Sequence, residues 1–243
     1  MNKKNREGRC SLCGSIGKLT FEHVPPKTAF NDNPIYFQDY DRMFNERSFL
    51  YGKKIRLNQG FGSYTLCPSC NNNTGNWYAK DFAEFARFGM RDIHVSKLLG
   101  LNKFVTGRHH IAPLNILKQI LTMFMSADKS GCLLNDKELT RFILDKDSQD
   151  FPKKYNVYVY STLSSIKRLM GYSIVYDPNL GICKWSEINF QPYGYVLTED
   201  SNPPDSDMYS IRYFSNFKYD YKIDILMKTP FLNVNNPMIG VYN

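Results

Sequence analysis

The sequence predicts an α+β protein, and three patterns lead to this prediction. Two Cys-x-x-Cys pairs, CSLC and CPSC, enclose a region of short strands and turns near the N-terminus. Apolar residues then recur at intervals of three and four, the period of an amphipathic helix. Further along, the period shortens to two, which is typical of strands in an antiparallel sheet. We therefore expect a cysteine-rich module in residues 1–80, helices in 81–150 and a β-rich domain in 151–243.

Length, charge and apolar content narrow the functional classes. The 243 residues suffice for one large domain or for a small domain joined to a larger one. The 31 Lys and Arg residues exceed the 23 Asp and Glu residues, so the net charge is +8 and an anionic partner is expected. No apolar run approaches the length of a membrane span, and the N-terminus lacks a signal-peptide pattern. We therefore expect a cytoplasmic protein with no membrane partner.

The cysteine pairs of the N-terminal module predict a metal site. A Cys-x-x-Cys pair favours a metal over a disulfide in a reducing compartment, and two such pairs place four thiolates around one tetrahedral zinc ion. The four ligands would be Cys10, Cys13, Cys67 and Cys70. A zinc ion with four thiolates is structural, so any chemistry must come from other residues. Cys132 and Cys183 have no neighbouring ligand types and are expected to be buried thiols.

Between the two pairs lies the string EHVPP, in which an acid and an imidazole are adjacent. Hydrolysis of a phosphodiester requires a base that deprotonates water and a divalent cation. His23 could be the base, and Glu22 could hold the cation. Neighbouring side chains of a strand point to opposite faces. Both can therefore face one substrate only if the strand ends or bends here, and Pro25 and Pro26 give a reason for that.

The second cysteine pair runs directly into the string NNNTGN. Asn71 follows the pair at the start of an expected helix, where its amide oxygen would be a neutral ligand for a hard ion such as Mg²⁺. Asn73 and Asn76 are alternatives, and asparagines near a helix start also serve as caps. The zinc cluster is what would bring Asn71 close to the acid and the imidazole.

Two helices are expected after the cysteine-rich module. The first follows the second cysteine pair and presents one aromatic face, made of Tyr78, Phe82, Phe85 and Phe88. Helical spacing favours core packing for these rings over the stacking of bases. The second helix is expected over residues 112–126, where Pro113 suits the first turn. Its apolar face consists of Leu114, Leu117, Leu121 and Phe124.

Alternating residues predict strands over 155–160 and 218–225, and the polar string TEDSNPPDSD, residues 198–207, predicts a loop between strands. This tyrosine-rich region is either a surface for target recognition or for a protein partner, or a sheet made of typical strand formers. The sequence leaves both interpretations open.

Several other residues have ordinary interpretations. Three further histidines are expected to be surface or core groups: His94, His109 and His110. Gly60 and Gly62 indicate a turn, because no Lys-Ser or Lys-Thr follows them as in a phosphate-binding loop. Four basic residues are candidates for phosphate contacts or for solvated surface: Lys27, Lys53, Lys54 and Arg56.

The order CSLC, EH, CPSC and then Asn71 resembles that of the HNH, or ββα-metal, endonucleases, in particular the branch whose hairpin and helix are braced by a four-cysteine zinc ion. The resemblance covers roughly residues 8–80. It implies that His23 is the general base, that Glu22 and Asn71 hold a catalytic divalent cation such as Mg²⁺, and that nucleic acid, with DNA favoured, is the substrate. Glu22 replaces the more usual aspartate, and Asn71 stands in place of a final histidine. The strings EHVPP and CNNNTG are similar to those of bacterial HNH proteins tied to defence against phage.

A second functional class stays open. A zinc-ribbon-like module would bind nucleic acid or protein without cleaving it. Binding alone does not require the set of Glu22, His23 and Asn71, so cleavage in the presence of magnesium distinguishes the two classes.

Overall fold

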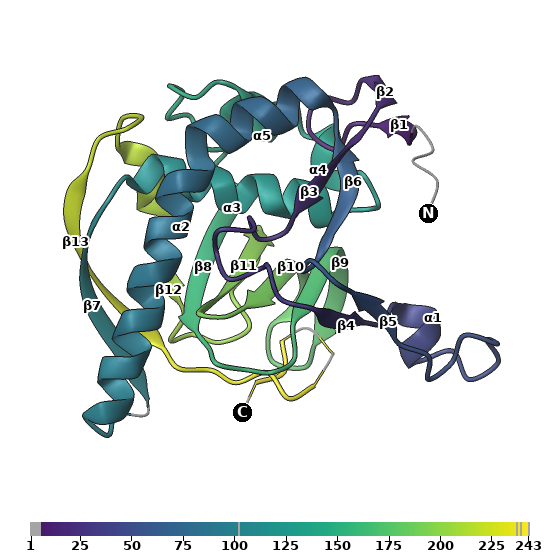
Figure 1. The fold of residues 1–243 in the computed structure, drawn as a ribbon. Coiled ribbons are helices and arrows are strands. Elements are labelled where there is room, and N and C mark those ends of the chain that lie inside the picture. The colour runs from purple at the N-terminus through teal and green to yellow at the C-terminus, as the bar shows by residue number, and fades with distance from the viewer. Residues whose placement is uncertain (1–5, 102, 237, 239, 243) are drawn as a thin grey trace.

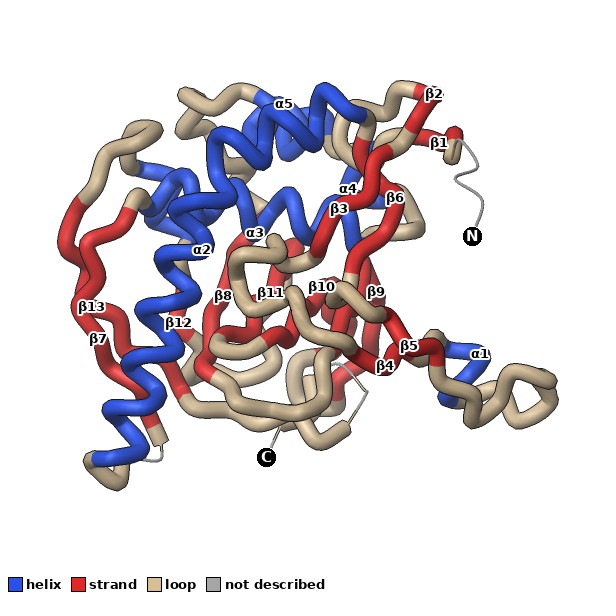
Figure 2. Tube along the Cα trace, in the orientation of Figure 1, coloured by secondary structure: helices blue, strands red, loops and turns tan. Residues whose placement is uncertain are grey.

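The computed structural model describes residues 6–101, 103–236, 238 and 240–242, and Figures 1 and 2 show its fold. These residues form an α+β protein in which all strand ladders are antiparallel. The α+β prediction is therefore confirmed. Among the described residues, no helix combines the length and the apolar character needed to cross a bilayer.

The N-terminal part consists of two small hairpins, an arm and a long helix. Its elements are β1 (Glu7–Arg9), β2 (Ile16–Lys18), β3 (Thr20–His23), β4 (Ile35–Phe37), α1 (Tyr40–Met43), β5 (Ile55–Leu57), β6 (Gly62–Leu66) and α2 (Pro68–Leu98). β1 pairs with β2, and β3 pairs with β6. The chain between β3 and β6 forms an arm with β4, α1 and β5, which projects from the body of the molecule (Figure 1). Asn58 and Gly60 pair across a turn at Gln59, with Gly60 at a φ of 79°, whereas Gly62 is the first residue of β6.

α2 confirms the helix expected after the second cysteine pair. Pro68 occupies its first turn, and the Cys67 thiol caps the helix by accepting a hydrogen bond from Cys70 N at 3.5 Å. Three of the four expected aromatic residues are buried, and Phe88 is half-buried with its ring stacked on His109. The aromatic face of α2 is therefore core, because it packs against other side chains of the same chain.

α3 (Pro113–Ala127) confirms the second expected helix, with Pro113 in the first turn. It lies between α2 and the large sheet (Figure 1) and is buried on every side, from Pro113 through Ser126. Its polar members are therefore also buried, namely Asn115, Lys118, Gln119, Thr122 and Ser126. Two short helices follow, α4 (Cys132–Asn135) and α5 (Lys137–Leu144).

The C-terminal part holds a five-stranded antiparallel sheet of order β12-β8-β11-β10-β9. Its strands are β8 (Tyr155–Ser161), β9 (Arg168–Asp177), β10 (Gly181–Phe190), β11 (Tyr193–Glu199) and β12 (Tyr209–Ser210), and a 3-10 helix, η1 (Arg212–Asn216), follows. β8 confirms the strand expected over 155–160. The expected loop follows β11, although Thr198 and Glu199 still belong to that strand.

The strand expected over 218–225 begins later than predicted. β13 (Ile223–Pro230) pairs with β7 (Phe104–Ile111), a strand that lies within the region predicted to be helical, and not with the five-stranded sheet. Residues 219–220 form a turn in which Asp220 has a φ of 59°. The backbone N–H of Asp220 donates to Asn115 Oδ1 on α3 at 3.2 Å. This contact stabilises a turn at a position where a strand was predicted.

One hydrophobic cluster joins residues from all three expected regions. It contains Leu12, Leu66, Phe85, Leu117, Val157 and Tyr195 among others. The boundaries at residues 80 and 150 stay predictions, and α2 runs without interruption through the first of them.

The two cysteines outside the pairs differ in burial. Cys183 is buried, as expected, but the prediction for Cys132 is wrong, because its side chain is exposed. Cys132 opens α4, and this short helix buries its next two residues instead.

Candidate functional site

The four paired cysteines come together as the spacing predicts. Their Sγ atoms all lie within 4.8 Å of one another, and Cys13 Sγ lies 3.8 Å from Cys67 Sγ. Thiolates at about 2.3 Å from a tetrahedral ion are about 3.8 Å apart, so the cluster fits such an ion. It joins the turn after β1 to the N-terminus of α2, and Cys67 N donates to Cys10 Sγ at 3.3 Å.

The electrostatics of this cysteine cluster also suit a cation. The Cys70 thiol donates a hydrogen bond that lowers the pKa of Cys10, and the same contact raises the pKa of Cys70. Four thiolates this close repel one another, and a metal ion would remove that repulsion. The cluster can therefore hold a metal ion, and the tetrahedral sulfur set is the one that zinc prefers.

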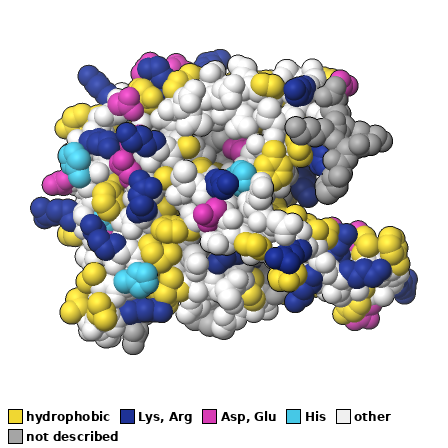
Figure 3. Space-filling model, in the orientation of Figure 1, with side chains coloured by type: hydrophobic (Ala, Val, Ile, Leu, Met, Phe, Trp, Pro, Cys, Tyr) yellow, Lys and Arg dark blue, Asp and Glu magenta, His cyan; other side chains and the backbone are white. Residues whose placement is uncertain are grey.

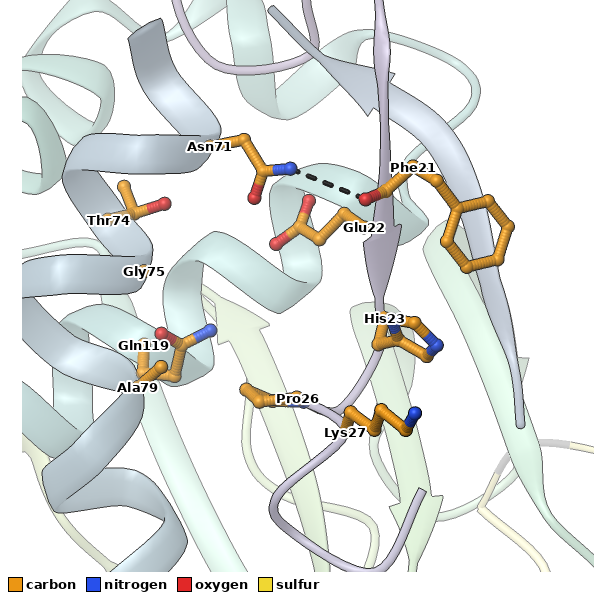
Figure 4. Close-up of a pocket in the computed structure, with 10 residues that line it drawn as sticks. All are labelled: Phe21, Glu22, His23, Pro26, Lys27, Asn71, Thr74, Gly75, Ala79 and Gln119. Atoms are coloured by element: carbon orange, nitrogen blue, oxygen red, sulfur yellow. Dashed lines mark hydrogen bonds between the residues drawn. The ribbon is translucent and has the colours of Figure 1, made fainter. Parts of the chain in front are cut away.

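A pocket of about 170 Å³ lies between β3 and α2. Figure 4 shows β3 and the turn after it on one side of this pocket and α2 on the other. Glu22, His23 and Asn71 all line the pocket, together with Lys27 and Gln119. The fold thus brings the three residues of the predicted catalytic set to one cavity.

Glu22 is the most buried of these three residues, with 7% of its surface exposed. Its Oε2 accepts hydrogen bonds from Ser126 Oγ at 2.5 Å and from Thr65 Oγ1 at 3.3 Å. Burial raises the pKa of Glu22 to about 7, and these two hydrogen bonds oppose the increase. Within the described part of the chain, no Lys, Arg or His forms an ion pair with this carboxylate. A buried acid of this kind is a ready ligand for a cation.

His23 is half-buried at the end of β3. Its ring contacts that of Phe21 edge-on at 5.0 Å, so these two side chains share one face of the strand and Glu22 lies on the other. β3 ends here, as the prolines predict, and both side chains reach the pocket. His23 Nε2 lies 3.0 Å from Gln59 O. A carbonyl oxygen only accepts, so Nε2 carries the proton of the neutral ring and Nδ1 is left free to act as a base.

Asn71 lies in the first turns of α2, on the side that faces β3 (Figure 4). Its Nδ2 donates to Thr20 Oγ1 at 2.9 Å and to Phe21 O at 3.4 Å. The amide oxygen is thereby turned into the space that also holds the Glu22 carboxylate (Figure 4). The alternatives Asn73 and Asn76 are exposed and do not line the pocket.

The walls of the pocket fit a bound ligand. Gly75 of α2 lines it, and a Cβ added there would meet no atom within 4 Å, so this wall is open to an approaching group. Glycine inside a helix lowers helix stability by about 1 kcal/mol relative to alanine. The donor set, one buried carboxylate and one amide oxygen, is of the hard type that Mg²⁺ or Mn²⁺ prefers.

Sequence reasoning missed two residues of α3, of which Gln119 lines the pocket and Ser126 donates to Glu22. Ser126 and Gln119 come from α3, seven residues apart and thus on one side of that helix. The signal was the recurrence of polar residues on one side of a mostly apolar helix. Asn31, within the cysteine-rich module, was also missed; it is buried after the turn that follows β3. It accepts from Phe61 N at 2.7 Å and donates to Pro25 O at 2.6 Å, and so ties this turn to the chain before β6.

The other predicted residues take ordinary positions. His94 is exposed, His110 is exposed and hydrogen-bonded to Asp224, and His109 is buried and hydrogen-bonded to Asp92, as expected for surface and core groups. Of the candidate phosphate contacts, Lys27 lies at the pocket, while the other three lie on or next to the arm: Lys53, Lys54 and Arg56. All four are exposed. Lys and Arg side chains are spread over the face shown in Figure 3, and Asp and Glu are fewer there.

Comparisons with models of protein families, with curated proteins and with solved structures found no match to this chain.

Proposed function

We propose that this protein is a metal-dependent endonuclease that hydrolyses phosphodiester bonds of nucleic acid, with DNA favoured as substrate. The observation that supports the proposal is the pocket between β3 and α2, which joins the Glu22 carboxylate, the Asn71 amide and the His23 imidazole. The cysteine cluster, for which we propose structural zinc, would fix α2 against the hairpin that carries the other two residues. The net charge of +8 favours a polyanionic substrate.

The residues of the pocket divide the chemistry among them. Glu22 and Asn71 would hold a divalent cation, which supplies the positive charge that stabilises the scissile phosphate and the departing oxygen. His23 takes a proton from the attacking water at Nδ1, because the carbonyl of Gln59 occupies its other nitrogen. Lys27 at the pocket edge contacts a backbone phosphate of the substrate.

Cleavage of supercoiled and linear DNA in a magnesium titration, with a chelator as the blank, tests this proposal. We expect His23→Ala to lower the cleavage rate by about a hundredfold or more, as loss of a general base does, while DNA affinity stays near that of the parent. His94→Ala is the matched control, because His94 is an exposed histidine of α2 remote from the pocket residues in sequence. We expect it to cleave as the parent does.

Two results would contradict the proposal. If His23→Ala cleaves as fast as the parent, His23 is not the base. If the parent binds nucleic acid but cleaves neither DNA nor RNA with any divalent ion, the non-catalytic zinc-ribbon-like module is the better description. Defence against phage, which the resemblance implies, is the cellular part of the proposal. Plaque counts on cells that express the parent or His23→Ala test that part separately.

A further inference from the structure

α3 brings a buried amide to the wall of the pocket. Gln119 lines the pocket and is 3% exposed. Its Oε1 is buried and has no hydrogen-bond partner in the described part of the chain. Figure 4 shows the amide nitrogen directed into the space between α2 and β3. A buried polar atom without a partner is destabilising, and the end of this amide that faces the space between α2 and β3 is the end that a bound group can reach.

The neighbouring polar side chains on this side of α3 have partners within the protein. Asn115 donates to Asp81 Oδ2 of α2 at 2.7 Å, and Ser126 donates to Glu22. Gln119 follows Asn115 by one turn and precedes Ser126 by two turns. It is the member of this series that reaches the pocket, so an unsatisfied amide lies where a ligand would bind.

The groups around Gln119 indicate which ligand this is. The Glu22 carboxylate is buried without an ion-pair partner among the described residues, and the Asn71 amide oxygen faces the same space (Figure 4). If the Gln119 amide is turned over so that Oε1, and not the nitrogen, faces this space, the pocket offers three oxygen acceptors. A hydrated divalent cation satisfies all three, because Mg²⁺ binds oxygen ligands and keeps several water molecules that donate hydrogen bonds.

We propose that Gln119 positions this cation: its amide oxygen accepts a hydrogen bond from a water molecule on an ion held by Glu22 and Asn71. The inference rests on the ion site of the proposed function and adds a residue to it. Rotation about the last side-chain bond exchanges the amide oxygen and nitrogen, which are similar in size, so the oxygen turns into the pocket without movement of α3. Mutation of a residue that hydrogen-bonds to a metal's ligands typically lowers metal affinity by about 10–100-fold.

Calorimetric titration of the zinc-loaded full chain with Mn²⁺ tests the proposal without any cleavage assay. We expect Gln119→Met to weaken Mn²⁺ binding about tenfold or more. Gln119→Glu is expected to retain or increase the affinity, because a carboxylate still accepts the hydrogen bond. Gln149→Met is the control, since Gln149 is exposed in the segment after α5, and its affinity should equal that of the parent.

Thermal unfolding with zinc retained and Mn²⁺ absent separates this positioning role from a structural one. Methionine is similar in volume and removes the unsatisfied amide, so we expect the Tm of Gln119→Met to equal or exceed that of the parent. A lower Tm for Gln119→Met, or Mn²⁺ affinity equal to that of the parent, overturns the proposal. So does a parent chain that does not bind Mn²⁺.

The failures of the two proposals are distinguishable. If the parent binds Mn²⁺ in a manner that depends on Glu22 and Gln119 but cleaves nothing, the endonuclease proposal fails and the role of Gln119 stands. If the parent cleaves DNA while Gln119→Met binds Mn²⁺ as tightly as the parent does, only the role of Gln119 fails.

Discussion

At the scale of single residues, Glu22 and His23 show how two neighbours acquire different properties. Because successive side chains of β3 point to opposite faces, Glu22 points toward α3, where Ser126 donates to its carboxylate. Thr65 of β6 donates to the same carboxylate. His23 stays half-buried beside Phe21, with Gln59 O fixing its tautomer. One residue is therefore a buried acid suited to holding a cation, and the other is a half-buried imidazole at the end of the strand. The end of β3 is what lets both reach one pocket.

The raised pKa of Glu22 predicts a pH-dependent stability. The ordinary pKa of a glutamate side chain is 4.5, and burial raises the pKa of Glu22 to about 7. Between these values the folded chain still holds the proton that the unfolded chain has released. The stability that this group contributes is therefore fully present below pH 4.5 and is lost as the pH rises through about 7. Without divalent ions, we expect Glu22→Gln to exceed the parent in free energy of unfolding at pH 8 by on the order of 3 kcal/mol.

Urea unfolding of the parent and of Glu22→Gln at pH 4.5 and at pH 8 measures this difference. The difference is expected to be small at the lower pH, where the carboxyl group is protonated in the folded chain and still about half protonated in the unfolded chain. The interpretation is wrong if the two proteins differ by the same amount at both pH values.

At the scale of elements, the cysteine cluster links two segments that are far apart in sequence. Cys10 and Cys13 lie in the turn after β1, whereas Cys67 and Cys70 lie at the start of α2. The backbone supports this link, because Ser11 N donates to Thr65 O of β6 at 2.8 Å. Asn71 follows the cluster directly, so the position of the cluster sets the position of this candidate ligand.

Replacement of one cysteine of the cluster is expected to release the metal and destabilise the chain. Cys67→Ser removes a thiolate ligand, while the serine hydroxyl keeps a side-chain acceptor at the N-cap of α2. A loss of several kcal/mol lowers the Tm by roughly 10 °C for a chain of this size. Elemental analysis for zinc and thermal unfolding measure the two effects. Cys132→Ser is the control, since Cys132 is exposed outside the cluster, and full zinc content in Cys67→Ser would refute the metal site.

At the scale of the whole molecule, α3 unites parts that the sequence presents as separate. It packs between α2 and the five-stranded sheet, and its buried polar residues contact both the pocket and the turn before β13. The aromatic face of α2 likewise depends on the sheet, because Phe85 stacks on Tyr193 of β11 with ring centroids 4.6 Å apart. The candidate catalytic pocket is therefore built by the N-terminal and central parts together.

This arrangement predicts that the N-terminal part does not fold alone. A fragment of residues 1–101 retains all four cysteines but loses Ser126 as a donor to Glu22 and exposes the aromatic face of α2. Burial of each such ring contributes about 1.5–3 kcal/mol, which the fragment forgoes. We expect it to aggregate or to give a poorly dispersed ¹H–¹⁵N spectrum even with zinc. A well-dispersed spectrum with the chemical shifts of the full chain would show an autonomous module instead.

The sequence by itself determined the features that depend on local pattern. The cysteine spacing located the cluster, and helical periodicity located α2 and α3. Alternation located β8. Glu22, His23 and Asn71 were also identifiable, because each stands next to a strong local signal, a proline pair or a cysteine pair. These patterns involve residues within a few positions of one another, so no knowledge of distant contacts was needed.

Only the tertiary structure decided which distant segments meet. Local alternation cannot choose a strand's partner, so the pairing of β13 with β7 was not predictable from either strand. The apolar pattern of α3 likewise predicted one buried face, but neighbours on every side bury its polar residues as well. The contact of Ser126 with Glu22 spans 104 positions. Such contacts depend on the packing of the entire chain. They place Gln119 at the pocket and bury Glu22.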